Sequence, residues 1–432
     1  MNVKIFDTKL FKENNSAFEK LKNIFPYFLA MIPCSIAIVR AGCSALTWDE
    51  AFTYMFYALP LSENPSVDLL VKISKTCHLN NHWINTVLIA FFTSLLKVKY
   101  SEFIVRLPVL IFAALFYLFS ARCVVKKTIS WLEFILLLFS YYLNEFFGLA
   151  RGYGICVSLV FVSLIFFREF ISNFSINKFW ISFYLLTLST YANSVSLLIV
   201  FAVGTVTVID LMRKHMFIEF VRKSLVHLLI CGESLLYILL FHMRASGAGM
   251  PVYSVDKVDF LFYVKQYFFL TTYHINFSNA FFLFVAITFV IVTIISLVFS
   301  DFNRFEFVLL FFIHLLLLLV MPFVFKRGGF LFRTLIPSYP LFVFCVGTVM
   351  KNIETLLAKR CRYAFYGVKS LLFVFCCLLF VVFIKRIDVM HTKEWFDNYK
   401  IKGLVMNGMT ENKNDANPCW EFYERQKQNM ER

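Results

Sequence analysis

The sequence predicts an all-α, polytopic membrane protein, and its composition and its pattern of apolar runs lead to this fold class. Of its 432 residues, 60% are hydrophobic and 19% are aromatic, an apolar share well above that of a soluble domain. Apolar stretches of roughly the 20 residues that cross a bilayer recur along the chain, separated by short polar loops. Helices are the expected spanning element because each one satisfies its own backbone hydrogen bonds.

The apolar runs predict about eleven spanning helices within a transmembrane domain at 24–386. No small-residue cleavage site follows the first run, so it is expected to stay attached as a helix. The predicted spans are 24–43, 104–123, 129–147, 152–170, 178–192, 194–211, 222–243, 279–300, 305–325, 334–351 and 364–385.

The distribution of Lys and Arg predicts the orientation of these spans. With residues 1–23 in the cytoplasm, the loops on the same side carry most of the cations, as the positive-inside rule requires. These loop cations are Arg122, Lys126, Lys127, Arg168, Lys178, Arg213, Lys214, Arg222, Lys223, Arg304, Lys351, Lys359, Arg360, Arg362 and Lys369. The same bias accounts for the net charge of +15 without a nucleic-acid partner.

Two segments on the opposite, outward side are too long to be simple turns, namely 44–103 and 244–279. Within them the stretches 69–75, 83–96 and 258–273 are short for spans and are predicted to be helices lying along the membrane interface. These helices are expected to act as lids over a cavity. The tail at 387–432 also faces outward and is too short for a catalytic domain of its own. Whether Cys43 and Cys77 are bridged stays open.

Two adjacent acids, Asp49 and Glu50, follow the first predicted span. A single acid here is commonly a helix cap, because acids favour helix N-termini. Neighbouring side chains on a helix point about 100° apart, so one acid can face a substrate while the other orients it. An alternative is that the pair holds a divalent cation.

Basic residues gather on the same predicted side as the acid pair. The guanidinium group of arginine can donate two parallel hydrogen bonds to a phosphate. Arg106, near a helix end, can instead reach lipid headgroups. The candidate phosphate-binding residues are Arg106, Arg151, Lys326, Arg327 and Arg333.

Three further polar residues are candidates for substrate contact. His82 lies in the first outward segment, and Glu145 and Tyr153 flank the turn between the third and fourth spans. A metal site at His82 with the acid pair is an alternative, although a lone loop histidine is more often simply hydrogen-bonded.

The chemistry that fits these residues is transfer of a group from a lipid-phosphate donor to a hydroxyl or amine. A carboxylate would deprotonate the attacking acceptor, and cations would stabilise the negative charge on the departing phosphate. The donor would approach laterally from the bilayer.

At these residues the chain resembles the GT-C superfamily of integral-membrane glycosyltransferases, in the protein O-mannosyltransferase and lipid A aminoarabinose transferase branch. The resemblance covers residues 24–350. It rests on an ordered set of patterns, which are Asp49-Glu50, Asn81-His82, Ser101-Glu102-Phe103 with Arg106-Leu107-Pro108, Glu145 with Arg151 and Tyr153, and Arg333 ahead of Pro337 and Pro340. Two positions depart from the pattern, since Trp83 and Gly152 stand where relatives often have proline.

The resemblance implies an inverting transfer of a single sugar from a polyprenyl-phosphate donor, with Asp49 as base and Glu50 assisting. Its branch also implies a bacterial cell inner membrane as the location, with the endoplasmic reticulum membrane as the alternative. The acceptor would be a glycolipid, a polysaccharide or a protein, and the sequence does not distinguish among them. Two other classes stay open, namely a lipid or oligosaccharide flippase and a non-catalytic subunit of a glycosyltransferase complex.

Overall fold

The computed structural model is all-α throughout the part of the chain that it describes. The described residues are 7–43, 46, 48–70, 82–247, 260–272, 278, 283, 287–288, 290–291, 293–294, 305–324, 332–360, 362–386 and 428. Seven of the described helices are long and apolar enough to cross a membrane, which confirms a helical, multi-pass membrane protein. The count of eleven stays a prediction, since most of the predicted span 279–300 lies outside the described residues.

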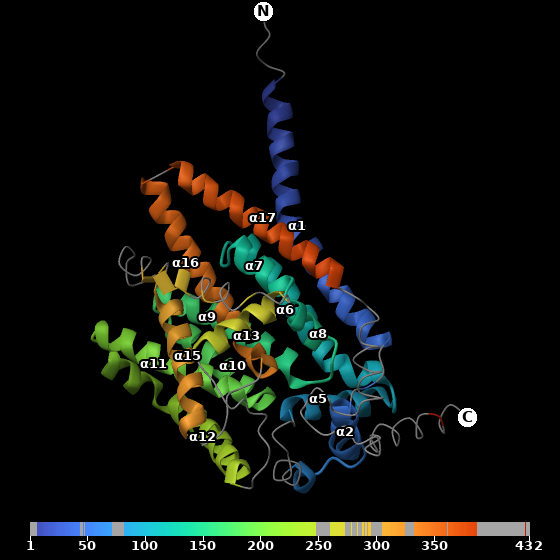
Figure 1. Cartoon of the computed structure of the whole chain (residues 1–432). Helices are drawn as coiled ribbons and strands as arrows, with labels where there is room; N and C mark the ends of the chain where they lie inside the picture. Colours follow the sequence, from blue (N-terminus) through green and yellow to red (C-terminus); the bar gives the residue numbers. More distant parts are fainter. Residues whose placement is uncertain are drawn as a thin grey trace, which may run out of the picture.

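The helices form one bundle, with α1 projecting from it (Figure 1). Their bounds are α1 Asp7–Cys43, α2 Trp48–Thr53, the π-helix η1 Tyr54–Ala58, α3 Leu59–Glu63, α5 Trp83–Leu96, α6 Glu102–Val125, α7 Trp131–Leu138, α8 Tyr141–Phe147, α9 Gly152–Asn173, α10 Ile176–Ala192, the 3₁₀ turn η2 Ser194–Ser196, α11 Leu197–Arg213, α12 Phe217–Gly247, α13 Phe260–Thr272, α15 Glu306–Val324, the 3₁₀ turn η4 Phe332–Ser338, α16 Tyr339–Arg360 and α17 Arg362–Arg386.

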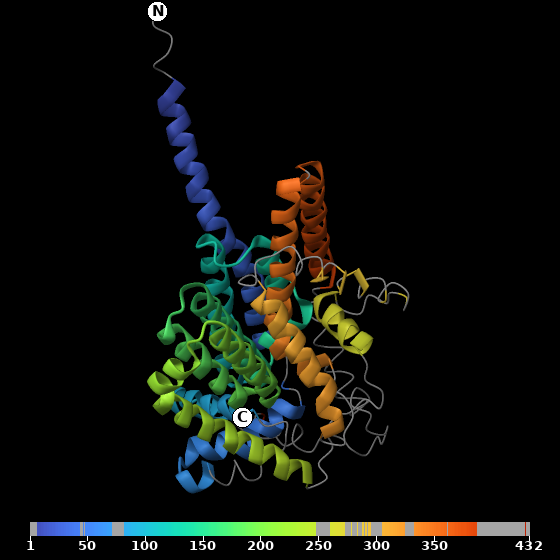
Figure 2. The ribbon, with the colours of Figure 1, turned by 90° about the vertical axis from the view of Figure 1, so that its left-hand side faces the viewer.

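The bundle has two ends, which we name by a residue at each. The Glu50 end carries α2, and the Lys127 end carries the turn that follows α6; α1 projects beyond the Lys127 end (Figures 1 and 2). Helix α6 runs from the Glu50 end to the Lys127 end. Helix α9 runs the same way, because Arg168 near its last turn donates to the carbonyl of Thr128 at 2.7 Å. The chain between them must therefore return across the bundle.

This return crossing is a broken helix. The predicted span 129–147 forms two short helices, α7 and α8, separated at Phe139 and Ser140. A break frees backbone carbonyls, which at membrane depth are tolerated only when protein groups satisfy them. The Asn144 amide donates to the carbonyls of Leu138 and Ser140, both at 2.8 Å. The hydroxyl of Tyr117 in turn donates to Oδ1 of Asn144.

Partners distant in sequence complete the capping of this break. The hydroxyl of Tyr339 donates to the carbonyl of Leu136 at 3.0 Å. The hydroxyl of Ser140 donates to the carbonyl of Leu270, at the end of α13, at 2.7 Å. The break is thus the point where α7, α8, α13 and α16 are joined by polar contacts.

Helix α13 packs inside the bundle. Tyr263 and Tyr267 of α13 are fully buried, and the location of the segment 258–273 along the membrane interface stays a prediction. Their hydroxyls donate to the carbonyl of Leu318 at 3.1 Å and pair with the hydroxyl of Ser338 at 2.7 Å. The aromatic rings fill the bundle while their polar tips find partners there, which explains how a Tyr-rich helix can be interior.

An ion pair fastens the Lys127 end. Arg168 pairs with Glu133 at 2.7 Å, and its guanidinium carbon lies 4.4 Å from the ring centroid of Phe344. Gly347 on α16 allows this approach, since a Cβ there would lie 2.3 Å from Cγ of Glu133. The contact joins α7, α9 and α16.

Asn144→Ala should destabilise the protein because it leaves buried carbonyls at the α7–α8 break without a donor. Each buried polar group left unsatisfied costs about 1–3 kcal/mol. Thermal unfolding of the purified protein in detergent measures the loss. Ser234→Ala is the matched control, since its exposed hydroxyl only donates to the carbonyl of Ile230 within α12, and should change stability by less than about 0.5 kcal/mol. Equal unfolding temperatures for the two variants would contradict the capping role.

Candidate functional site

Helix α2 contains the acid pair and lies at the Glu50 end. The backbones of Asp49 and Glu50 both lie in α2, which continues through the π-helix η1 into α3. The Glu50 side chain is fully buried. The Asp49 side chain lies outside the described part of the chain. A π-helical turn next to a functional position is a recurring arrangement in proteins.

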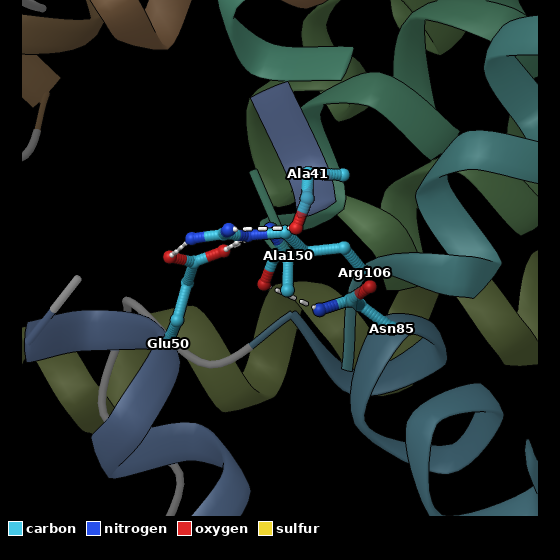
Figure 3. Close-up of polar contacts among 5 residues, drawn as sticks. All are labelled: Ala41, Glu50, Asn85, Arg106 and Ala150. Carbon is cyan, nitrogen blue, oxygen red and sulfur yellow. Dashed lines mark hydrogen bonds and ion pairs between the residues drawn. The ribbon is translucent and has the colours of Figure 1, made fainter. Parts of the chain in front are cut away.

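Glu50 forms a two-pronged ion pair with Arg106 of α6. Nε and Nη2 of Arg106 each donate to one carboxylate oxygen of Glu50 at 2.8 Å (Figure 3). Both side chains have no exposed surface. The third guanidinium nitrogen, Nη1, donates to the carbonyl of Ala41 at 3.2 Å. The pair therefore joins α2 and α6 to the last turn of α1.

The turn between α8 and α9 is held by the same group of residues. The backbone N–H of Ala150 donates to Oε1 of Glu50, and the amide of Asn85 in α5 donates to the carbonyl of Ala150 at 2.7 Å. Figure 3 shows Ala150 between these two partners. The segments that contain Ala41, Asn85, Arg106 and Ala150 thus meet around Glu50.

Three of the predicted site residues gather beside this turn. The ring of His82 lies edge-on to that of Tyr153, with centroids 4.9 Å apart, and the Arg151 guanidinium lies 5.6 Å from the Tyr153 centroid. Nδ1 of His82 hydrogen-bonds to the carbonyl of Ala192 at 2.7 Å. A carbonyl accepts only, so Nδ1 is the donor, and a neutral His82 ring then presents Nε2 as an acceptor.

Gly152 is required where these residues meet. A Cβ at this position would lie 2.3 Å from the carbonyl oxygen of Ala192 and 2.5 Å from Cβ of His82. Proline, like any other residue with a Cβ, would therefore not fit at position 152, because α9 begins in direct contact with His82 and Ala192.

Glu145 lies in a neighbouring group with Arg40, a residue that the sequence analysis missed. Arg40, in the last turn of α1, is only 3% exposed, and Glu145 is 6% exposed. The Arg40 guanidinium lies 5.5 Å from the ring centroid of Tyr141. Nε of Arg40 and Oε2 of Glu145 are buried and have no hydrogen-bond partner in the described structure. The available signal was a charge within an apolar span, which is costly and commonly functional.

The structure brings together Glu50, Arg106, Arg151, His82, Glu145 and Tyr153 at one end of the bundle. Arg333 has its backbone in η4, and its side chain lies outside the described residues. Lys326, Arg327 and Cys77 also lie outside them, as does the side chain of Cys43. Among the side chains that the structure describes, no group of three His, Cys, Asp or Glu is placed to hold a metal ion.

Comparison with protein-family models, curated proteins and solved structures gives no match to this chain. The GT-C resemblance and everything that it implies therefore stay predictions.

Glu50→Gln should destabilise the protein strongly, because it leaves the buried guanidinium of Arg106 without a counter-charge. Breaking a buried ion pair on one side costs about 3–5 kcal/mol. The double variant Glu50→Gln/Arg106→Met removes both charges and should recover part of the loss, which thermal unfolding in detergent measures.

Glu63→Gln is the control for this prediction, since it breaks the exposed ion pair with Lys99 and should cost no more than about 1 kcal/mol. If Glu50→Gln unfolded at the same temperature as Glu63→Gln, the structural role of the buried pair would be wrong.

Proposed function

We propose that this chain is a glycosyltransferase that moves a single sugar from a polyprenyl-phosphate donor to a hydroxyl or amine acceptor at the Glu50 end. The observation that carries the proposal is a layer of buried polar side chains at one end of an apolar bundle. Arg40 and Glu145 in this layer have polar atoms without a partner among the residues that the structure describes. The resemblance to GT-C enzymes adds the type of reaction.

Buried polar atoms without partners favour a ligand at this position. A buried ionisable group that is not fully hydrogen-bonded is costly, and inside a membrane protein it commonly marks a binding site. A guanidinium N–H is complementary to a phosphate oxygen, and a carboxylate oxygen accepts from a sugar hydroxyl. Arg40 and Glu145 together thus suit a phosphorylated sugar.

The contacts of Glu50 suggest different roles for Asp49 and Glu50. Both Glu50 oxygens accept from Arg106, and one also accepts from the N–H of Ala150. In the proposal Glu50 therefore positions α2, and Asp49, about 100° further around the helix, acts as the base. Arg106 then serves mainly as the partner of Glu50, and Arg40 joins the predicted phosphate contacts Arg151, Lys326, Arg327 and Arg333.

The proposed reaction is a single displacement at the anomeric carbon. The carboxylate of Asp49 takes the proton of the acceptor, whose oxygen or nitrogen forms a bond to that carbon. The bond from the carbon to the phosphate oxygen breaks, and its electron pair leaves with the polyprenyl phosphate beside the arginines. Attack opposite the leaving group inverts the configuration. His82 and Tyr153 would line the sugar position, and a divalent cation at the acids is the alternative way to stabilise the phosphate.

In the proposed orientation the N-terminus is cytoplasmic, and the Glu50 end and the C-terminus face outward, in a cell inner membrane. A flippase or a non-catalytic subunit would bind lipid or partner without forming a glycosidic bond. Mass spectrometry of cell-surface glycans from cells with and without this chain separates these classes. If cells without the chain lose one sugar from their glycans but still export the lipid carrier of that sugar, the result supports the transferase.

Asp49→Asn should lower sugar transfer by about 10²–10⁴-fold, the usual contribution of a general base, with unchanged thermal unfolding. Cells lacking the chain are complemented with each variant, and the transferred sugar is quantified by mass spectrometry. Asp68→Asn is the matched control, because Asp68 is an exposed acid in the same outward segment. Normal transfer by Asp49→Asn would refute its role as the base.

Arg40→Gln should weaken binding of polyprenyl phosphate by about 10–100-fold, because a hydrogen bond to a charged group contributes about 1.5–3 kcal/mol. Native mass spectrometry of the purified protein titrated with polyprenyl phosphate measures the change. The control is Arg122→Gln, which removes an exposed cation at the Lys127 end. Equal affinities of the two variants would remove Arg40 from the site.

A further inference from the structure

A large cavity lies at the Lys127 end, away from the proposed catalytic residues. Its volume is about 1400 Å³, and its walls come from α1, α7, α16 and α17, with contributions from α9 and α15. Small-molecule sites are roughly 300–1,000 Å³, so this cavity has room for a larger ligand. The helices that frame it are visible in Figure 1.

The walls of the cavity are mostly apolar and include several aromatic rings. Phe25 of α1, Phe139 at the α7–α8 break, and Phe373 and Phe380 of α17 all line it. Trp131 also lines it, with 43% of its surface exposed. Such walls suit acyl chains.

Cations surround this apolar interior. Lys22, Lys127, Lys351 and Lys369 line the cavity and have exposed side chains. Within the described residues, neither Lys127 nor Lys351 forms an ion pair.

The cavity lining also contains Arg168 and three acids, but the cations still outnumber the acids. Glu133 and Arg168 neutralise each other in an ion pair. The other two acids are Glu306, which is buried, and Glu354, which is half-buried. The lysines that line the cavity therefore complement a negatively charged headgroup.

We infer that this cavity binds an anionic phospholipid, with its acyl chains against the aromatic walls and its phosphate among the lysines. Basic pockets between transmembrane helices are suited to anionic headgroups, and each Lys or Arg near the membrane surface adds about fivefold to the attraction. The bound lipid would fill the space between α17 and the helices α1 and α7. This inference does not depend on the proposed function, because the cavity and the Glu50 site lie at opposite ends.

Quenching of Trp131 fluorescence by brominated lipid tests the inference. The full chain is reconstituted in phosphatidylcholine vesicles that contain increasing mole fractions of brominated phosphatidylglycerol or brominated phosphatidylcholine. Subtracting the signal of Trp131→Phe isolates the contribution of Trp131. We expect half-maximal quenching at a mole fraction of phosphatidylglycerol about tenfold below that of phosphatidylcholine.

Two triple variants with the same charge change provide the comparison. Lys127→Gln/Lys351→Gln/Lys369→Gln should abolish the preference for phosphatidylglycerol. Lys126→Gln/Lys178→Gln/Lys223→Gln removes three cations outside the cavity, and this variant should keep the preference for phosphatidylglycerol. Circular dichroism checks that both variants are folded.

Three results would overturn the inference. One is equal quenching by the two lipids, and another is the same preference in both triple variants. The third is displacement of brominated phosphatidylglycerol by polyprenyl phosphate at a much lower mole fraction than by unlabelled phosphatidylglycerol, which would assign the cavity to the proposed donor.

Discussion

The ion pair between Glu50 and Arg106 is the interaction on which the Glu50 end depends. Arg106 also binds the carbonyl of Ala41, and Glu50 also accepts from the N–H of Ala150. One buried pair therefore fixes α1, α2, α6 and the turn before α9 relative to one another. Two buried charges are stable here because each is matched by the other and by backbone groups. The candidate site residues on these elements take their positions from this pair.

The broken crossing α7–α8 depends on a second set of buried polar contacts, and it links the interior to the site. Asn144 and Tyr339 satisfy the carbonyls that the break frees. Helix α8, which begins after the break, carries Tyr141 and Glu145 and leads directly into the turn that Glu50 holds. A continuous helix would need no such partners. Sequence elements more than 200 residues apart are therefore required to bring Glu145 to the Glu50 end.

The sequence predicts the long spans well, because apolar runs such as those of α6 and α9 are local properties. It does not predict the α7–α8 break, since no proline or glycine marks Phe139 and Ser140 and the capping group of Tyr339 comes from another helix. The sequence also does not predict that Glu50 pairs with Arg106. The two residues are 56 positions apart, and each could equally well contact a substrate. The environment of Arg40 is not a local property either, because its neighbours Tyr141 and Glu145 come from α8.

Two kinds of buried charge lie side by side at the Glu50 end, and the contrast between them bears on function. Glu50 and Arg106 satisfy each other. Arg40 and Glu145 each keep an unpartnered atom within the described structure, although apolar side chains at these positions would avoid that cost. A polar layer that served stability alone would be expected to have its members satisfied. The incomplete contacts of Arg40 and Glu145 therefore favour a role in binding a polar ligand, positioned by the complete pair beside them.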